Sequence, residues 1–329
     1  MESQEVITNN INGNNRSAVE VMRRYIESLP EEISFKEEVS SYQFWKAVRT
    51  EFLATLLFIV FTCGSCMSYT SLPPKFMTNV SSIEYQNSSE TSFEAIVLEL
   101  KIALVFGLTA ATLIQCTGHV SGCHMTPAIT LSLLVTRRLT IFRCFLYIIV
   151  QCLASVVGSA IIYGLLTSEE RLHSGLGLTL PNQNLNATQV FGYEFLSTFI
   201  VVLTFLVNSD PQRSDAGFKS LSIGFAYSVA HLFSFRHTGA SLSPARSFGP
   251  ALIKGVWTDH WIYWLAPLIS GMVSGFTYEY IRSTNSSECQ TLKSSFRRRP
   301  SHGVKRDQSS NLSNYETEFT ITSTECPRY

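Results

Sequence analysis

Two stretches decide the fold: HVSGCHMTPAITL at 119–131 and HTGASLSPARSF at 237–248. Each passes from a His through a Gly to a Thr or Ser that precedes Pro-Ala, and in both the Gly lies four positions before that Thr or Ser. Pro is favoured at the first position of a helix, because its missing N–H would have no partner there. A hydroxyl on the preceding residue can cap such a helix by accepting a backbone N–H. The two stretches therefore predict helices that begin at Pro127 and Pro244.

The apolar runs that follow, 127–135 and 244–253, are too short to cross a bilayer. At about 1.5 Å per residue each covers about 15 Å, half of the roughly 30 Å hydrocarbon core. Placed end to end from opposite sides of the membrane, the two runs make one complete span. We therefore expect two half-helices.

The rest of the chain contains six apolar segments long enough to cross a membrane, which takes about 20 residues. Apolar residues make up 45% of the 329 residues and charged residues only 15%, with much of the charge in the two ends. One apolar block fits the core of a soluble protein, but six favour a membrane protein. The expected spans are 45–69, 93–116, 140–166, 190–208, 218–236 and 260–281.

Composition argues against several other classes. The formal net charge is zero, so no excess of basic charge points to nucleic acid as a partner. The eight cysteines are too sparse for the disulfide framework of a small secreted domain. The first apolar run begins near Ala47, too late for the hydrophobic core of a signal peptide. No nucleophile–base set is visible in the apolar region, so we expect neither an enzyme nor a cofactor.

The stretch CTGHVSGCH at 116–124 mixes Cys and His in a way that can ligate zinc. The repeat explains it better, because His119 has a counterpart in His237 and Gly122 has one in Gly239. We therefore predict no metal site.

Lys and Arg gather on one side of the predicted spans, which places both termini in the cytoplasm. The opposite side carries sequons at Asn79, Asn87 and Asn186, which are candidates for N-glycosylation on an outward face. We expect a multi-pass protein of the plasma membrane. The basic residues that indicate this orientation are Lys46, Arg49, Arg137, Arg138, Arg143, Arg213, Lys219, Arg282 and Arg297.

The repeat extends beyond the two half-helices. EFLATLLFIVFT at 51–62 matches EFLSTFIVVLTF at 194–205, so the first span corresponds to the fourth. Three spans per half make the second half enter from the opposite side, which is an inverted repeat. Glu51 and Glu194 are equivalent in this repeat, and a carboxylate within a span needs a partner. We expect both to accept hydrogen bonds from the half-helix loops; a proton-relay role is the alternative.

The chain resembles the major intrinsic protein family, the aquaporins and aquaglyceroporins, over about residues 42–282. The resemblance is carried by GHVSGCHMTPAITL, TGASLSPARSFGPALI, EFLAT and HWIYW. It implies an all-α membrane protein with six transmembrane helices and two re-entrant half-helices in an inverted repeat. It also implies a homotetramer with four separate pores in the lipid bilayer. The expected parts are an N-terminal tail at 1–44, a channel domain at 45–282 with repeats at 45–166 and 190–282, and a C-terminal tail without fixed structure at 283–329.

Members of the family have Asn-Pro-Ala at both half-helices, where this chain has Thr126-Pro127-Ala128 and Ser243-Pro244-Ala245. A hydroxyl still caps the helix, but it offers one O–H where an Asn amide offers two N–H donors. We predict that the pore at the two caps orients water more weakly and is slightly wider. The alternative is that the two replacements have no functional effect. Each helix N-terminus carries about half a positive charge, which belongs to the backbone and repels cations whichever cap is present.

Arg246 directly follows Ser-Pro-Ala, and an Arg at a pore mouth is costly and usually functional. The resemblance assigns it to the selectivity filter with Phe106, His231 and Ala240, a set similar to water-selective members. Taken alone, His231 is an ordinary hydrogen-bonding residue between helices. Cys123 is the repeat counterpart of Ala240, so it is the candidate site for mercurials.

The resemblance implies a passive channel whose permeant is water. One alternative is a channel for small neutral solutes such as glycerol, urea or hydrogen peroxide. Another is a poorly conducting membrane scaffold or adhesion protein, which the long polar tails and the two altered caps leave open.

Overall fold

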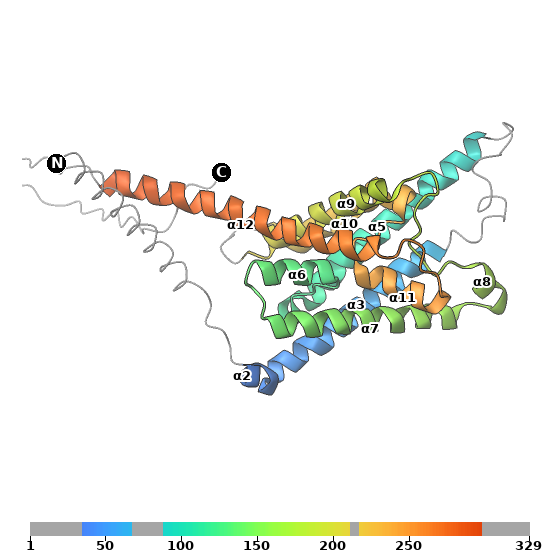
Figure 1. Cartoon of the computed structure of the whole chain (residues 1–329), viewed down its shortest axis with the longest axis horizontal. Coiled ribbons are helices and arrows are strands. Elements are labelled where there is room, and N and C mark those ends of the chain that lie inside the picture. Colours follow the sequence, from blue (N-terminus) through green and yellow to red (C-terminus); the bar gives the residue numbers. More distant parts are fainter. Residues whose placement is uncertain (1–34, 68–87, 211–216, 298–329) are drawn as a thin grey trace, which may run out of the picture. The chain divides into compact units, whose positions relative to one another are not determined.

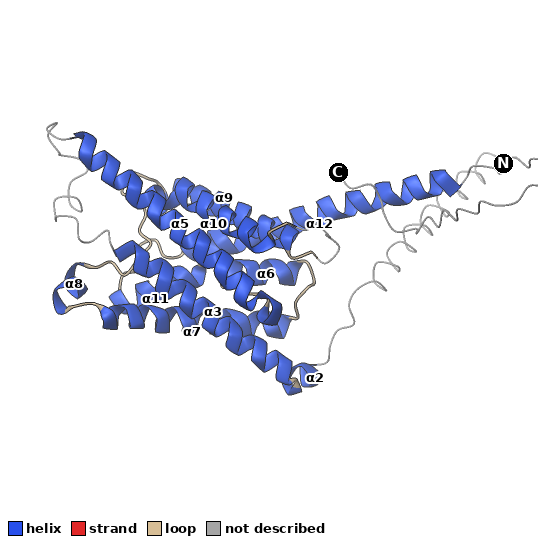
Figure 2. Ribbon diagram, turned by 180° about the vertical axis from the view of Figure 1, so that it is seen from behind, coloured by secondary structure: helices blue, strands red, loops and turns tan. Residues whose placement is uncertain are grey.

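The structure, a computed structural model, describes residues 35–67, 88–210 and 217–297. Figure 2 shows helices joined by loops, with no strand among these residues. The chain divides into two units, residues 1–277 and 278–329, and the helix bundle is the first. The long helices (Figure 1) are α3 (Tyr42–Cys66), α5 (Ser88–Ser121), α7 (Ile141–Leu165), α9 (Ala187–Asn208), α10 (Lys219–Thr238) and α12 (Ile262–Arg297). The short helices are α2 (Phe35–Ser40), α6 (Pro127–Val135), α8 (Ser168–His173) and α11 (Pro244–Lys254).

The six long helices correspond to the six predicted spans, and α6 and α11 correspond to the two predicted half-helices. Helices α3, α7, α9 and residues 95–121 of α5 are long and apolar enough to cross a membrane by length and composition alone. Helix α10 is more polar, because serines and histidines recur along it, and it packs against both α5 and α9. The predicted all-α fold with two half-helices is confirmed.

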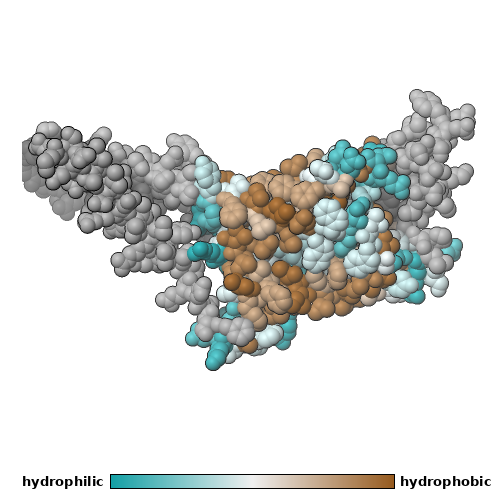
Figure 3. Space-filling model, viewed as in Figure 1, coloured by the Kyte–Doolittle hydropathy of each residue, from teal (hydrophilic) through white to brown (hydrophobic). Residues whose placement is uncertain are grey.

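The bundle exposes apolar side chains on its outer surface and buries polar and charged groups among apolar ones. Figure 3 shows a brown, apolar band across the middle of the visible face, with teal residues toward both ends. Large apolar side chains are exposed on this outer surface, among them Leu53, Phe61, Leu104, Leu108, Phe145 and Leu153. The fully buried side chains include the charged and polar groups Glu51, Glu194, Gln151, His231 and Arg246.

Helices α5 and α10, which are equivalent in the repeat, cross at a pair of glycines. A Cβ built on Gly107 would overlap the Ser228 hydroxyl and lie 2.5 Å from the Gly224 carbonyl oxygen. A Cβ on Gly224 would lie 2.5 Å from the Gly107 carbonyl oxygen. Ser228 donates a hydrogen bond to the Ala103 carbonyl at 3.0 Å. Small residues let membrane helices approach this closely, so this crossing joins the two halves of the repeat.

The half-helices also join the two halves. A Cβ on Gly271 of α12 would lie 2.5 Å from the Ala128 carbonyl of α6, and one on Gly275 would lie 3.3 Å from the Ser132 carbonyl. The G-x-x-x-G of α12 therefore serves packing within the chain. Helix α11 packs in the same backbone-to-backbone way on α7, where a Cβ on Gly249 would overlap Ser155. Each half-helix thus rests on a long helix from the other half.

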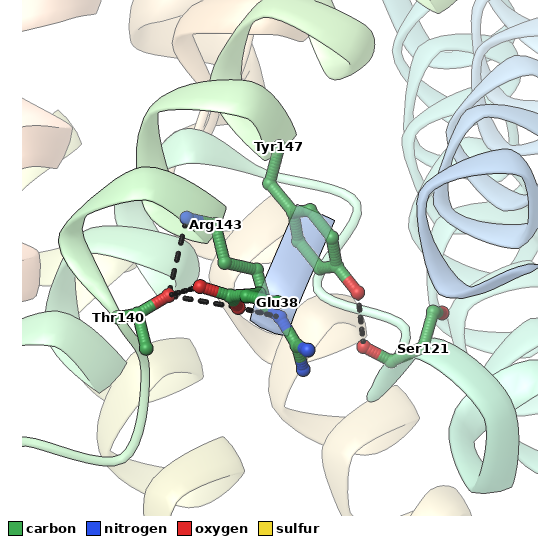
Figure 4. Close-up of polar contacts among 5 residues, drawn as sticks. All are labelled: Glu38, Ser121, Thr140, Arg143 and Tyr147. Atoms are coloured by element: carbon green, nitrogen blue, oxygen red, sulfur yellow. Dashed lines mark hydrogen bonds and ion pairs between the residues drawn. The ribbon is translucent and has the colours of Figure 1, made fainter. Parts of the chain in front are cut away.

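The N-terminal segment that we expected to be a polar tail contains helix α2, which is held by a buried carboxylate (Figure 4). Glu38 is 4% exposed and accepts hydrogen bonds from the Thr140 hydroxyl at 2.8 and 2.9 Å and from Arg143 Nε at 3.0 Å. Thr140 caps α7 by accepting the Arg143 backbone N–H at 3.3 Å. The Glu38 contacts thus hold α2 to the start of α7, and the Arg143 guanidinium carbon also lies 5.2 Å from the ring centroid of Phe44 in α3.

The end of the last span also differs from expectation. Helix α12 continues to Arg297, into the segment from 283 onward that we expected to lack fixed structure. The candidate sequons at Asn79 and Asn87 lie outside the described residues, whereas Asn186 is exposed at the start of α9.

Replacing Gly107 by Ala is expected to destabilise the bundle, because the new methyl group has no room beside Ser228 and the Gly224 carbonyl. Overpacking of this kind lowers the free energy of unfolding by about 1–3 kcal/mol. The melting temperature of the purified protein in detergent is therefore expected to fall. Gly192→Ala in α9 is the matched control, since a Cβ there meets no heavy atom within 4 Å. Equal melting temperatures for the two variants would contradict the close crossing of α5 and α10.

Candidate functional site

The loop that leads into α6 has an unusual backbone. Gly122 has a φ of 87°, and the non-glycine residues Cys123 and Met125 also have positive φ, at 51° and 58°. Left-handed conformations cost about 1–2 kcal/mol for residues with a side chain. Thr126 then returns to an extended conformation and begins the helix.

The loop into α11 repeats this backbone. Gly239 has a φ of 80°, Ala240 one of 47° and Leu242 one of 54°, and Ser243 is extended. Two loops with different side chains therefore adopt the same strained conformation, which needs a specific set of contacts to hold it.

Buried carboxylates supply those contacts. In the first half, Glu51 of α3 accepts the backbone N–H groups of His124 at 3.2 Å and Met125 at 2.5 Å. Gln151 of α7 donates from Nε2 to Glu51 at 3.0 Å and to the Thr130 hydroxyl at 3.0 Å. The carboxylate thus holds the loop and is itself held by a neighbouring helix.

In the second half, Glu194 of α9 accepts the backbone N–H groups of Ser241 and Leu242, each at 3.0 Å. It also accepts the Thr238 hydroxyl at 2.5 Å. Glu194 is fully buried, so these donors replace the water that it lacks.

A pair of tyrosines completes the symmetry, and the motifs gave no sign of it. Tyr147 of α7 donates to the Ser121 carbonyl at 3.1 Å (Figure 4), and Tyr263 of α12 donates to the Thr238 carbonyl at 2.9 Å. Both hydroxyls hold the last turn of the long helix that precedes a half-helix loop. The register that pairs Gly122 with Gly239 places Trp264 opposite Tyr147, one position from Tyr263, so the repeat does not pair the two tyrosines.

The hydroxyls of Thr126 and Ser243 cap the half-helices. Thr126 Oγ1 accepts the backbone N–H of Ala128 at 3.1 Å and of Ile129 at 3.4 Å. Ser243 Oγ accepts the backbone N–H of Arg246 at 3.3 Å. Pro127 and Pro244 are the first residues of α6 and α11, and Ala128 and Ala245 are fully buried after them.

Phe106, His231 and Arg246 come together from three different helices. The rings of Phe106 and His231 have centroids 3.7 Å apart, and the Arg246 guanidinium carbon lies 5.6 Å from the Phe106 centroid. All three are at most 1% exposed. Arg246 donates from Nη1 to the carbonyl of Gly177, in the loop between α8 and α9, a contact that no sequence motif indicated.

This constriction leaves one acceptor and one donor without a protein partner among the described residues. His231 Nδ1 lies 2.8 Å from the Tyr227 carbonyl and must donate to it, because a carbonyl only accepts. In a neutral ring, the buried Nε2 is then an acceptor with no partner. The Nε–H of Arg246 is likewise buried and unpaired. A molecule that both donates and accepts can satisfy the two atoms together.

Ala240, the fourth predicted member, lies in the loop that Glu194 holds. Its backbone N–H donates to the Thr238 hydroxyl at 3.2 Å, and its side chain is fully buried. Cys123, its repeat counterpart, is also fully buried and donates its N–H to the Ser121 hydroxyl at 3.1 Å.

The charged constriction exists in one half of the bundle only. The repeat register that pairs Gly122 with Gly239 places apolar residues where the second half has an imidazole and a guanidinium. The counterparts of Phe106, His231, Ala240 and Arg246 are Ile223, Ile114, Cys123 and Ile129.

Glu99 of α5 pairs with Arg236 of α10, with 3.9 Å between Oε1 and Nε. The Arg236 side chain is 73% exposed, so this ion pair adds little stability. Its place outside the constriction gives it no part in the site.

An all-helical membrane protein with two half-helices beside a buried aromatic, imidazole and guanidinium constriction belongs to the class of channel proteins. The major intrinsic protein family matches residues 38–278, and the chain belongs to this family. Aquaporin-4 of Mus musculus is 37% identical over 292 residues, which cover 88% of this chain and 84% of the mouse protein. Aquaporin-1 of Bos taurus is 36% identical over 246 residues, covering 74% and 85%.

A solved structure of another protein has the same fold. The X-ray structure of the aquaglyceroporin from Plasmodium falciparum matches with a TM-score of 0.58 and 20% identity, covering 71% of this chain and 95% of that one. The protein is therefore an integral membrane channel of the family and not an enzyme.

Replacing Glu194 by Gln is expected to destabilise the second loop. The amide keeps one acceptor oxygen and directs an NH₂ group at a backbone N–H. The loss of one charge-assisted hydrogen bond costs about 1.5–3 kcal/mol of unfolding free energy, which a melting curve in detergent measures. Glu169→Gln on α8, where the side chain is exposed, is the matched control. If the two variants have the same melting temperature, the Glu194 carboxylate does not hold the loop.

Proposed function

We propose that the protein is a passive water channel of the plasma membrane with both termini in the cytoplasm. It forms a homotetramer with one pore in each subunit. The observation that carries the proposal is the constriction of Phe106, His231 and Arg246, where one buried acceptor and one buried donor have no partner in the described part of the chain. Water donates and accepts at once and is small enough to pass between an imidazole and a guanidinium.

Exclusion of ions has two sources. One is the buried guanidinium of Arg246, which repels cations. The N-termini of α6 and α11 each add about half a positive charge, from backbone N–H groups. These dipoles do not depend on whether the cap is Asn, Thr or Ser, so the altered caps do not open a proton path.

A channel for small neutral solutes is the second candidate. The pair of hydroxyl caps favours it, because Thr126 and Ser243 are shorter than Asn and their oxygens already accept backbone N–H groups. A wider, less polar point between the half-helices would admit glycerol, urea or hydrogen peroxide. His231 opposes this reading, since its ring narrows the constriction.

Osmotic swelling of proteoliposomes separates these functions. We expect fast water flux in a sucrose gradient and no glycerol uptake by the unchanged protein. His231→Ala is expected to raise glycerol permeability at least tenfold while water still passes, because the ring that narrows the constriction is removed. His119→Ala, at an exposed position, is the control. Rapid glycerol uptake by the unchanged protein would support the solute channel, and no flux at all would support a scaffold.

Restoring both amides, with Thr126→Asn and Ser243→Asn together, is expected to raise water flux per channel by less than tenfold. The amides add N–H donors toward the lumen, where the hydroxyls have one O–H each. Stopped-flow light scattering, normalised to protein content, measures the change. Ser168→Asn at an exposed position serves as the control. An unchanged flux would mean that the hydroxyl caps are variation without functional effect.

A further inference from the structure

A buried tyrosine hydroxyl in the second half of the bundle has no part in the constriction of Phe106, His231 and Arg246. Tyr227 of α10 is 1% exposed, and its Oη is buried without a hydrogen-bond partner among the described residues. A phenol hydroxyl can both donate and accept a hydrogen bond. Burying it unpaired costs free energy that a Phe of nearly the same shape would avoid. A hydroxyl kept at this position indicates a partner outside the protein.

Tyr227 lies one helical turn from the constriction. It precedes His231 by four residues, so the two side chains share one face of α10. The ring of Phe58 in α3 packs against both Phe106 and Tyr227, with centroids 5.8 and 5.7 Å apart. The Tyr227 ring therefore continues the row of buried side chains that Phe106 and His231 begin.

The position of Tyr227 along α10 is close to the middle of the membrane. Helix α10 has 20 residues and is about 30 Å long, which is the thickness of the hydrocarbon core. Tyr227 comes eight residues after Lys219, about 12 Å from the start of the helix. Half-helices that meet end to end have their caps at this depth. Tyr227 is therefore one turn further into the membrane than His231, on the side of the caps.

The two caps have few donors to offer at that depth. Thr126 Oγ1 and Ser243 Oγ accept backbone N–H groups of their own helices, so each has a single O–H left to donate. The Tyr227 hydroxyl adds a third donor, which also accepts.

The Tyr227 hydroxyl shares the asymmetry of the constriction. The register of the repeat places Ala110 of α5 opposite Tyr227, and both side chains are buried. His231 and Arg246 also occur in the second half only. A group that supported the half-helices would recur in both halves, as the caps and the buried carboxylates do. A polar group present once fits a role in the path itself.

We propose that the Tyr227 hydroxyl is a second water-binding group of the permeation path, one turn inward from His231. It replaces one of the hydrogen bonds that a water molecule gives up when it enters the constriction. Successive turns of α10 are about 5.4 Å apart, close to the length of two O–H···O bonds between waters, about 2.7–2.8 Å each. A single file can therefore bond to both side chains with one water between them. This inference rests on the proposed water channel, because it assigns a further group to the same path.

Tyr227→Phe tests the inference, because it removes the hydroxyl and keeps the ring that packs on Phe58. We expect water flux through proteoliposomes to fall about threefold, the order of one net hydrogen bond, and its activation energy to rise. The melting temperature in detergent is expected to stay that of the unchanged protein, since the hydroxyl has no partner in the described part of the chain. Stopped-flow light scattering at several temperatures measures flux. Tyr42→Phe, at a side chain that is 73% exposed, is the matched control.

Equal flux and activation energy in Tyr227→Phe and the unchanged protein would overturn the inference. So would a lower melting temperature with unchanged flux, because the hydroxyl would then bond to the protein.

An experimental structure of the unchanged protein, at a resolution that shows ordered water, separates this inference from the proposed function. It also serves if the variant does not fold. We expect a water oxygen within hydrogen-bond distance of Tyr227 Oη, and a dry hydroxyl would overturn the inference. Water at Oη in a protein that shows no osmotic flux would contradict the proposed function alone.

Discussion

Everything in this channel depends on backbone groups that must find partners where lipid surrounds the bundle and water is scarce. A half-helix can end at mid-membrane only if the loop before it is satisfied inside the protein. Glu51 and Glu194 do this by accepting two loop N–H groups each, at 2.5–3.2 Å. The loops need that support, because three positive φ values within four residues are unfavourable without it.

The same constraint explains how the two halves are joined. Backbones approach each other closely where α5 crosses α10 and where each half-helix packs on a long helix. Glycines at these places leave the room for this approach. Membrane helices gain little from hiding apolar surface from lipid, so close packing of small residues carries the association. The halves therefore cannot slide or separate without breaking the support of α6 and α11, and the position of the constriction is fixed by the bundle as a whole.

The sequence predicted the parts whose signal is local or repeated. Pro127 and Pro244 marked the starts of α6 and α11, and the repeat placed Glu51 opposite its loop, because both signals are written within a few residues. The contact of Arg246 with Gly177 could not be predicted, since it joins distant segments with no motif. Glu38 was missed because a charge in a polar segment gives no sign that it will be buried against α7.

The fold is nearly symmetric, but the constriction is not, and this difference separates two tasks. The loop conformations, carboxylates, tyrosines and caps recur in both halves, because both half-helices meet the same structural demand. The imidazole and guanidinium occur in one half, opposite Ile114 and Ile129 in the other. A change of both caps from Asn to hydroxyl therefore alters the symmetric part, whose helix dipoles come from the backbone. In the proposed channel, selection between solutes rests on the asymmetric part, where the His231 ring lies against Phe106.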